Sequence, residues 1–498
     1  FKQKTAYEIS LGLVGSEMCI RDSIFGNPGT SEAPLIDMLG DYPELRYFLT
    51  LQESVAMGMG ESYARATEKP SFVSLHVDSG LANGIALMLD ALNTGTPMVI
   101  TSANYDARKI NENKTDLAEL VRPVTKWSVE LNLPDQIPSV MRRAFHEANS
   151  HPKGPVYVGF TANALEAEAE MNIVPSSKMH DSYRPNSQGI QEAVKLIMAA
   201  KRPMMMVGDR VSDDHANDLA VELAELMGLS VYQSRGAEVS FPTTHPQFFG
   251  NHTLRVTSNR QALEDVDLLL AIGMDAMDEL FYWGDVILGE QTKLIHIDPI
   301  PGRAGRSEPT DVGIVSHCGL AIEELLGPIK SLLTPELEND INIRRSGVVA
   351  AAAEKRKDFD DSVATKWDNK PMSPARMMSE LSKAIPDDAI VVDDSISNRA
   401  AMRHYFQGHK RGDLRAFRGQ SIGGGIGATM GTQVANPDRP VFGIIGDGSA
   451  MMTIQGLWTA ANDNIPCIFV ICNLSLIHIS EPTRPRLISY AVFCFKKK

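Results

Sequence analysis

Two acidic residues in this sequence stand where an α/β fold can use them for chemistry, and Glu53 is the first. It opens a segment rich in glycine, alanine and methionine, Glu53-Ser-Val-Ala-Met-Gly-Met-Gly60, that is typical of a helix. An acid with few polar neighbours along the sequence should keep its proton more readily than a solvated acid, so Glu53 is a candidate for proton transfer. The structural alternative is a helix-initial acid that only complements the helix dipole.

Asp447 is the second acid, in a Gly446-Asp447-Gly448-Ser449 segment that follows the apolar run Val441-Phe-Gly-Ile-Ile. Open α/β sheets bind ligands at the carboxyl ends of their strands, and glycines there let a ligand approach the backbone closely. An aspartate in this position can hold Mg²⁺, which prefers oxygen ligands and substrate phosphates. Taken alone, the segment is equally typical of an ordinary turn after a strand.

Further polar groups occur at fixed places around Asp447. A helix is expected over 452–462, and the apolar strand after it ends in Asn473. Upstream, Asp393-Asp394-Ser395-Ile-Ser397 follows a strand, and its hydroxyls and the next helix N-terminus can bind a diphosphate. Gln420-Ser-Ile422-Gly423-Gly-Gly425 precedes a helix rich in alanine and glycine. A capped turn and plain core packing are the respective alternatives.

The elements that must position these residues alternate between short apolar runs and longer helical patterns. This alternation indicates βαβ units and parallel sheets. At roughly 150 residues per domain, the length of 498 residues predicts about three domains. We therefore expect an α/β fold with three consecutive doubly wound parallel-sheet domains, the third truncated. Their expected ranges are 24–175, 189–333 and 371–473, with linkers at 176–188 and 334–370, the latter containing a helix.

The buried strands of these domains are expected at the apolar runs. A helix is also expected over 213–227, and Ser373-Pro374 is typical of a helix start, with serine as the cap and proline at the first helical position. The expected strands cover 72–75, 98–101, 156–160, 204–208, 268–273, 294–297, 389–392, 441–445 and 467–472.

Both ends of the chain look foreign to their neighbours. Residues 1–23 and 474–498 break the α/β pattern and resemble translated sequencing-adapter read-through, with divergent natural termini as the alternative. We therefore leave both segments out of the fold prediction. On this interpretation residues 24–473 are a fragment, and the literal chain is expected to be insoluble or inactive.

Together, these motifs resemble those of thiamine diphosphate-dependent enzymes. The resemblance implies that Asp447 and Asn473 are Mg²⁺ ligands. It also implies that Glu53 hydrogen-bonds N1′ of the aminopyrimidine and favours the imino tautomer, whose nitrogen deprotonates C2 of the thiazolium ring. Ile422 matches the bulky apolar residue that holds the cofactor bent. The implied cofactor-binding residues are Asn27, Gly29, Asn83, Asp394, Ser395, Ser397, Ile422, Gly423, Gly446, Gly448 and Ser449.

Segments 24–32, 74–83 and 124–127 resemble the pyrimidine-binding domain of benzoylformate decarboxylase and its relatives. This resemblance implies that His76 lies near the substrate carboxylate and acts in proton transfer. It also places Thr30 where that family has a serine that contacts substrate. Acetolactate synthases resemble the chain less closely, because Asn27-Pro28-Gly29 replaces their usual Gly-Gly turn.

The sequence departs from the family pattern at two places. Leu474 and Leu476 stand where the family has a second, metal-binding asparagine and a backbone carbonyl ligand. Phe281, beside Tyr282 and Trp283, stands where aryl-keto acid decarboxylases supply a second active-site histidine, so the identity of the keto acid stays open.

The resemblance predicts a thiamine diphosphate- and Mg²⁺-dependent 2-keto acid decarboxylase of benzoylformate decarboxylase type. An acetolactate synthase-like carboligase and a catalytically dead structural protein of the same fold are the alternatives. In this family each site joins the first block of one chain to the third block of another, which implies a homodimer or homotetramer.

Composition and charge exclude other classes of function. The net charge of −14 leaves no broad basic surface for nucleic acid. No apolar run approaches the ~20 residues that span a bilayer. Five cysteines without a CxxC pair indicate reduced thiols and a cytoplasmic protein. Gly423-x-Gly425-x-x-Ala428 lacks the strand and the acid of a dinucleotide site, and nothing indicates a flavoprotein.

Overall fold

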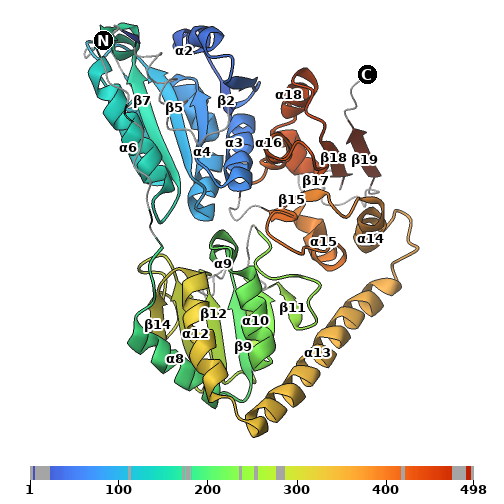
Figure 1. Ribbon diagram of the computed structural model, residues 1–498. Coiled ribbons are helices and arrows are strands. Elements are labelled where there is room, and N and C mark those ends of the chain that lie inside the picture. The colour runs from blue at the N-terminus through green and yellow to red at the C-terminus, as the bar shows by residue number, and fades with distance from the viewer. Residues whose placement is uncertain are drawn as a thin grey trace. The chain divides into compact units, whose positions relative to one another are not determined.

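The computed structural model of this chain describes residues 4–5, 23–109, 114–170, 174, 180, 182–234, 238–251, 256–275, 287–416, 421–473 and 489–494 (Figure 1). The chain divides into two compact units, of which the first holds 1–179, 386–397 and 417–498. Strand β1 (Lys4–Thr5) pairs antiparallel with β8 (Glu168–Ala169), and β19 (Ser489–Cys494) pairs antiparallel with β18 (Ile468–Asn473). Each terminal segment thus contributes one strand that pairs with a strand of the intervening chain.

The first sheet has six parallel strands in the order β3-β2-β4-β5-β7-β6. The elements of this domain are β2 (Ser23–Asn27), α2 (Ala33–Asp37), β3 (Arg46–Leu49), α3 (Glu53–Thr67), β4 (Ser71–Leu75), α4 (Val77–Thr94), β5 (Met98–Asn104), α5 (Leu117–Val121), β6 (Trp127–Leu131), α6 (Ile137–Asn149), β7 (Pro155–Thr161) and α7 (Ala162–Glu166).

Neighbouring residues of these strands enter two different cores, because side chains alternate across a sheet. Phe25 and Val73 pack with α3 and α4 in one cluster, whereas Ile24 and Phe72 pack with α6 in the other. Burial on both faces explains why the strands are continuous apolar runs rather than alternating ones. Helices cover both faces, as a doubly wound fold requires.

The other sheet of the first unit runs β15-β17-β18-β19, with β15, β17 and β18 mutually parallel. Its elements are β15 (Ile390–Asp394), α16 (Gly425–Ala435), β17 (Val441–Gly446), α17 (Asp447–Met452), α18 (Gly456–Asn462) and β18. The strands expected at 389–392, 441–445 and 467–472 are confirmed to within two residues.

The second unit contains a six-stranded parallel sheet in the order β11-β10-β9-β12-β13-β14. The chain thus has three α/β domains with parallel sheets, as predicted. The elements of this unit are α8 (Ser187–Ala199), β9 (Pro203–Val207), α9 (Asp209–Asp213), α10 (Asn217–Met227), β10 (Ser230–Gln233), β11 (Phe248–Asn251), α11 (Val256–Leu263), β12 (Leu268–Ile272), β13 (Lys293–Asp298), β14 (Val312–Val315), α12 (Cys318–Leu332), α13 (Pro335–Ala364), α14 (Pro374–Ala384), α15 (Arg399–Tyr405) and β16 (Leu414–Ala416).

Two helix predictions were wrong in their bounds. The helix expected over 213–227 is interrupted after Asp213, where His215 adopts a left-handed φ of 51°, and α10 begins only at Asn217. The helix expected over 452–462 begins only at Gly456, because α17 ends at Met452 and the chain turns at Thr453, whose hydroxyl donates to the carbonyl of Gly423. The Ser373 cap before Pro374 is confirmed. No helix in the described ranges combines the length and apolarity needed to cross a lipid bilayer.

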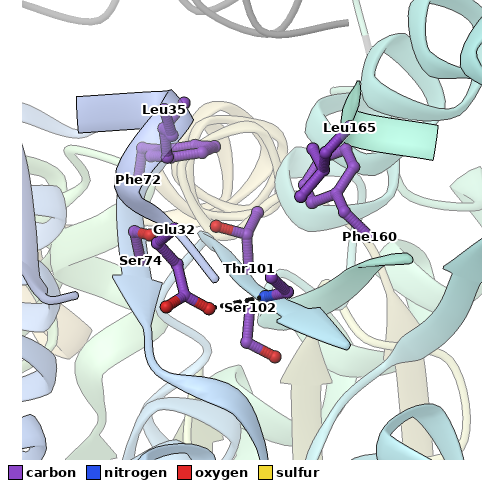
Figure 2. A pocket seen from close by; sticks show the side chains of 9 residues that line it. Glu32, Leu35, Phe72, Ser74, Thr101, Ser102, Phe160 and Leu165 are labelled. Carbon is purple, nitrogen blue, oxygen red and sulfur yellow. Dashed lines mark hydrogen bonds between the residues drawn. The ribbon is translucent and has the colours of Figure 1, made fainter. Parts of the chain in front are cut away.

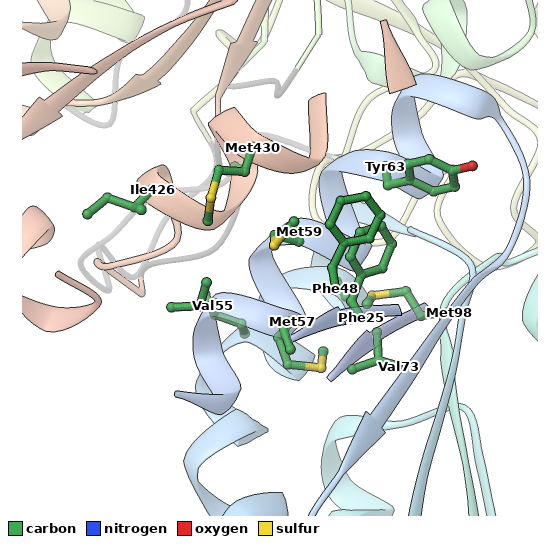
Figure 3. Packing of buried hydrophobic residues seen from close by; sticks show 14 of the residues in the cluster. Phe25, Phe48, Val55, Met57, Met59, Tyr63, Val73, Met98, Ile426 and Met430 are labelled. Carbon is green, nitrogen blue, oxygen red and sulfur yellow. The ribbon is translucent and has the colours of Figure 1, made fainter. Parts of the chain in front are cut away.

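Helices α3 and α16 pack directly against each other within the first unit (Figure 3). Small residues line the contact, since a Cβ added at Gly427 would lie 2.7 Å from the carbonyl oxygen of Val55. Gly431 is even closer to the backbone of Met59. Val55, Met59, Ile426 and Met430 belong to one buried cluster with both sheets of this unit. The glycines therefore let the helix that begins at Glu53 approach the helix that follows Ile422.

Replacing Gly431 by alanine should destabilise the first unit by about 1–3 kcal/mol, because the new methyl group meets the backbone of Met59 rather than a movable side chain. The matched control is Gly347→Ala in α13, where nothing lies within 4 Å of an added Cβ. That control should gain up to about 1 kcal/mol of helix propensity. Thermal unfolding of the two variants measures the contrast, and equal melting temperatures would contradict the tight packing.

Candidate active site

The first sheet reverses its winding at β2, which has β3 on one side and β4 on the other. Ligands of open α/β sheets bind at such a switch point, beyond the carboxyl ends of the strands. The parallel register pairs Asn27 with Leu75, so the turn after β2 and His76 after β4 leave the sheet side by side. The predicted residues Asn27, Gly29 and His76 are therefore brought together by topology.

Glu53 begins α3 and reaches the same edge. Gln52 caps the helix by accepting from the N–H of Val55, which fixes the direction in which Glu53 leaves the backbone. The Glu53 carboxylate is 7% exposed, and its Oε1 accepts from Asn27 Nδ2 at 3.2 Å. Its Oε2 accepts from Asn83 Nδ2 at 3.0 Å. Two amides that are distant in sequence therefore surround the side chain.

His76 is held by an acid to which the sequence analysis assigned no function. Its Nδ1 lies 2.7 Å from Oε2 of Glu32, whose side chain is 3% exposed. Glu32 Oε2 also accepts from the N–H of Gly29 at 3.0 Å, and Oε1 accepts from the N–H of Ala103 at 2.8 Å. The only feature of the sequence that could have indicated a function for Glu32 was its position, three residues after Gly29 at the start of α2.

Glycines make room for these side chains. A Cβ at Gly80 would lie 2.8 Å from Oε1 of Glu53 and 3.1 Å from Cβ of His76, so the two candidate catalytic side chains both lie close to this glycine. A Cβ at Gly29 would collide with the His76 ring. Thr30 is exposed on the turn next to them.

A second polar edge lies at the carboxyl ends of β15, β17 and β18. Asp394, which is 4% exposed, accepts at Oδ2 from the N–H of Gly425 at 2.9 Å and from the hydroxyl of Ser449. The Ser449 oxygen in turn accepts from the N–H of Gly423 at 2.7 Å. These bonds fix the loop of Ile422, whose side chain is 40% exposed, to the segment that contains Asp447.

Burial, with the neighbouring charge of Asp393 as a lesser cause, raises the pKa of Asp394 to about 6, although its hydrogen-bond donors oppose the shift. The folded state therefore holds this proton more tightly than the unfolded chain, whose aspartate has a pKa near 3.8. The stabilisation is fully present below pH 3.8 and is lost as the pH rises through about 6.

We expect Asp394→Asn to remove this pH dependence. Between pH 4 and 6.5 the wild-type free energy of unfolding should contain a component that falls by on the order of 2–3 kcal/mol, which the variant lacks. Denaturant unfolding at several pH values measures the difference between the two proteins. Parallel curves for wild type and variant would show that Asp394 ionises as an ordinary aspartate.

Asn473 is the last residue of β18, and Asp447 directly follows the neighbouring parallel strand β17. Gly446 pairs with Cys472, so the residues that follow them lie at the same height on the sheet edge. Both are partly exposed, and Asp447 Oδ1 also accepts from the N–H of Gly448 at 2.9 Å. In the described part of the chain no three His, Cys, Asp or Glu side chains form a metal-binding group. Any metal here therefore needs oxygens from asparagine, backbone, water or a bound phosphate.

The remaining predicted site residues differ in their surroundings. Ser395 is buried, and its hydroxyl donates to Oδ1 of Asp393 at 2.9 Å, whereas Ser397 is exposed. Gln420, Phe281, Tyr282, Trp283, Leu474 and Leu476 lie outside the described residues.

Comparison with known protein families matches all three domains. Residues 19–121 match the "Thiamine pyrophosphate enzyme, N-terminal TPP binding domain", residues 190–325 the central domain and residues 397–476 the C-terminal TPP binding domain. The chain belongs to the thiamine pyrophosphate enzyme family.

Among curated relatives of this thiamine pyrophosphate enzyme, a benzoylformate decarboxylase of Pseudomonas aeruginosa is 29% identical over 458 residues, covering 90% of this chain and 82% of the relative. A probable acetolactate synthase large subunit of Methanococcus aeolicus is 28% identical, covering 91% and 79%. A thiamine diphosphate-dependent 4-hydroxybenzoylformate decarboxylase of Rhodococcus jostii superposes with a TM-score of 0.79 at 25% identity, covering 97% and 90%. A putative thiamin diphosphate-dependent enzyme of Mycobacterium smegmatis gives 0.82 at 25%, covering 98% and 90%.

The residues of both edges fit the thiamine pyrophosphate cofactor of this family. A carboxylate with fixed orientation suits the nitrogen-rich ring, and Gly80 keeps the space beside it open. The anionic end needs donors and cations, and the second edge offers the N-terminus of α17 and two oxygen-bearing side chains that can hold a divalent cation. The two edges therefore match the two chemically different ends of the cofactor.

Proposed function

We propose that this chain is a thiamine diphosphate- and Mg²⁺-dependent 2-keto acid decarboxylase of benzoylformate decarboxylase type. The observation that carries the proposal is the cluster at the switch point of the first sheet. There, a fixed Glu53 carboxylate and a His76 ring anchored by Glu32 lie close to the space kept open by Gly80. The similarity to a benzoylformate decarboxylase supports the same reaction class.

In this proposal residues 24–175 bind the pyrimidine end of the cofactor, 189–333 form the central domain, and 371–473 bind the diphosphate. Asp447 and Asn473 would hold Mg²⁺, with Gly446, Gly448 and Ser449 around the diphosphate. Asn27, Gly29 and Asn83 would surround the pyrimidine, and Ile422 would support the bent cofactor. When bound, the cofactor supplies an electron sink for the bond that is cleaved.

The protein's own groups have distinct tasks in this scheme. Glu53 holds and exchanges a proton at a carboxylate oxygen, with Asn27 and Asn83 fixing its direction. A decarboxylase must also return a proton to the carbon that loses CO₂, and His76 can carry it on Nε2, because Nδ1 is occupied by Glu32. Thr30 is exposed beside them, where a substrate carboxylate would lie.

We further propose that two or four copies assemble, because apolar side chains are exposed near both edges. Leu51 precedes Glu53 and is 47% exposed, while Met451 and Met452 follow Asp447 and are 60% and 57% exposed. A second copy of this chain is the occupant that would bury them and complete each site. Size-exclusion chromatography with light scattering tests this, and a monomer at micromolar concentration contradicts it. Cys318, a buried free cysteine, supports a location in the cytoplasm.

A panel of 2-keto acids, supplied with thiamine diphosphate and Mg²⁺, tests the reaction. We expect CO₂ release with one aldehyde formed per keto acid consumed, measured by product mass analysis. A product formed from two keto acid molecules would instead indicate an acetolactate synthase-like carboligase. A folded chain whose melting temperature does not respond to the cofactor would indicate a catalytically dead structural protein.

A further inference from the structure

Glu32 is a buried carboxylate whose hydrogen bonds converge on the predicted site. Its three hydrogen-bond donors among the described residues all lie at the carboxyl edge of the first sheet: Gly29 after β2, His76 after β4 and Ala103 near the end of β5. In the described part of the chain, His76 is the one ionisable side chain paired with it. A buried charge must be compensated by donors, and here the imidazole supplies the side-chain donor.

We propose that Glu32 is the positioning residue of His76, holding its ring so that Nε2 faces the reacting substrate. The catalytic role of His76 in this inference rests on the proposed function, whereas the position of its ring rests on the hydrogen bonds described above. A carboxylate oxygen accepts hydrogen bonds, so the His76 nitrogen 2.7 Å away must carry the proton. Nδ1 is therefore the N–H, and in the neutral ring Nε2 is the acceptor.

The exposed fractions of the Glu32 and His76 side chains differ. Glu32 is 3% exposed and His76 is 32% exposed, so the imidazole bonds a buried acid through Nδ1 while part of the His76 side chain stays accessible. Gly29 contributes to this arrangement, because any Cβ at that position would occupy the place of the ring. Gly29 thus leaves room for the His76 ring, and Glu32 holds the ring in that room through a hydrogen bond.

Glu32 also lines a small cavity (Figure 2). It measures about 20 Å³, which is room for about one water, and Ser74, Thr101 and Ser102 line it together with apolar side chains. The Ser74 hydroxyl has no partner among the described residues. None of the residues that line this cavity is basic, so among the described residues His76 is the ionisable side chain paired with the carboxylate.

The test is a double-mutant cycle with Glu32→Ala and His76→Ala. Removing His76 should lower kcat by about 10²- to 10⁴-fold, as expected for a lost proton-transfer group. Removing Glu32 should lower kcat by about 10- to 100-fold, as for other residues that orient a functional imidazole. If Glu32 acts through His76, the double variant should be no slower than His76→Ala alone. The KM for the keto acid and the binding of thiamine diphosphate should change much less than kcat.

Glu61→Gln is the control for loss of a buried acid in the same domain. Glu61 is 2% exposed, and it bonds Thr96 and Arg65 rather than His76. It should lower the melting temperature while turnover per folded molecule stays near that of the wild type. Losses that multiply in the double variant, or a Glu32→Ala enzyme as fast as wild type, would overturn the positioning role.

Crystal structures of the cofactor-free proteins test the geometry without turnover. The His76 ring should have one orientation in the wild type and should rotate or become disordered in Glu32→Ala. An unmoved ring in the variant would overturn the inference even where the enzyme is active. If wild type consumes no keto acid, the proposed function fails separately, and the ring orientation still decides whether Glu32 positions His76.

Discussion

Replacing Glu53 by glutamine should lower kcat by about 10²- to 10⁴-fold, the range for loss of a general acid or base. Glutamine has nearly the same shape, so the helix start and the space beside Gly80 are preserved. It cannot exchange a proton, and its NH₂ group must face one of the two amide donors, Asn27 or Asn83. Steady-state kinetics with the keto acid identified by the panel measure the effect.

The control for this prediction is Glu68→Gln, an exposed acid at the opposite end of the same helix. Its activity should match that of the wild type. Binding of thiamine diphosphate to the Glu53 variant, followed by thermal shift, separates a failed proton transfer from a failed binding site. Turnover of the Glu53→Gln protein within a few-fold of wild type would remove the basis for assigning catalysis to this cluster.

The second large effect is expected at the opposite end of the cofactor. Asp447→Ala should raise the Mg²⁺ concentration needed for half-maximal activity by at least about 100-fold, since even residues that only orient a metal ligand change affinity by 10- to 100-fold. Asn473 alone should be too weak a site, because Mg²⁺ in proteins is normally held by at least one carboxylate together with phosphate oxygens. Metal-dependent activity and calorimetric Mg²⁺ titration both measure this.

Asp438→Asn is the matched control, because Asp438 is exposed in the same domain and lies before β17 rather than after it. Its Mg²⁺ requirement should equal that of the wild type. Removal of metal with a chelator should abolish wild-type turnover, and added Mg²⁺ should restore it. An Asp447→Ala enzyme with an unchanged Mg²⁺ requirement would show that the metal, if used, binds elsewhere.

The sequence by itself determined the class of fold and most of the candidate site. Buried parallel strands are continuous apolar runs, and this local signal located strands such as β4, β9 and β12 within two residues. Asp447 was found because it follows a buried apolar strand, whereas Asn27 and His76 were predicted from the resemblance of their segments to a known enzyme family. Their clustering then follows from parallel topology alone.

Only the tertiary structure decided which groups surround each of these residues. Glu32 and Ala103, or Asp394 and Ser449, are distant in sequence, and no local periodicity couples them. The amides that bond Glu53 were missed for the same reason, because Asn27 and Asn83 lie 26 and 30 residues away from it in the sequence. The requirement for glycine at position 431 likewise becomes visible only when α3 and α16 pack together, because the backbone of Met59 then occupies the space that a side chain would need.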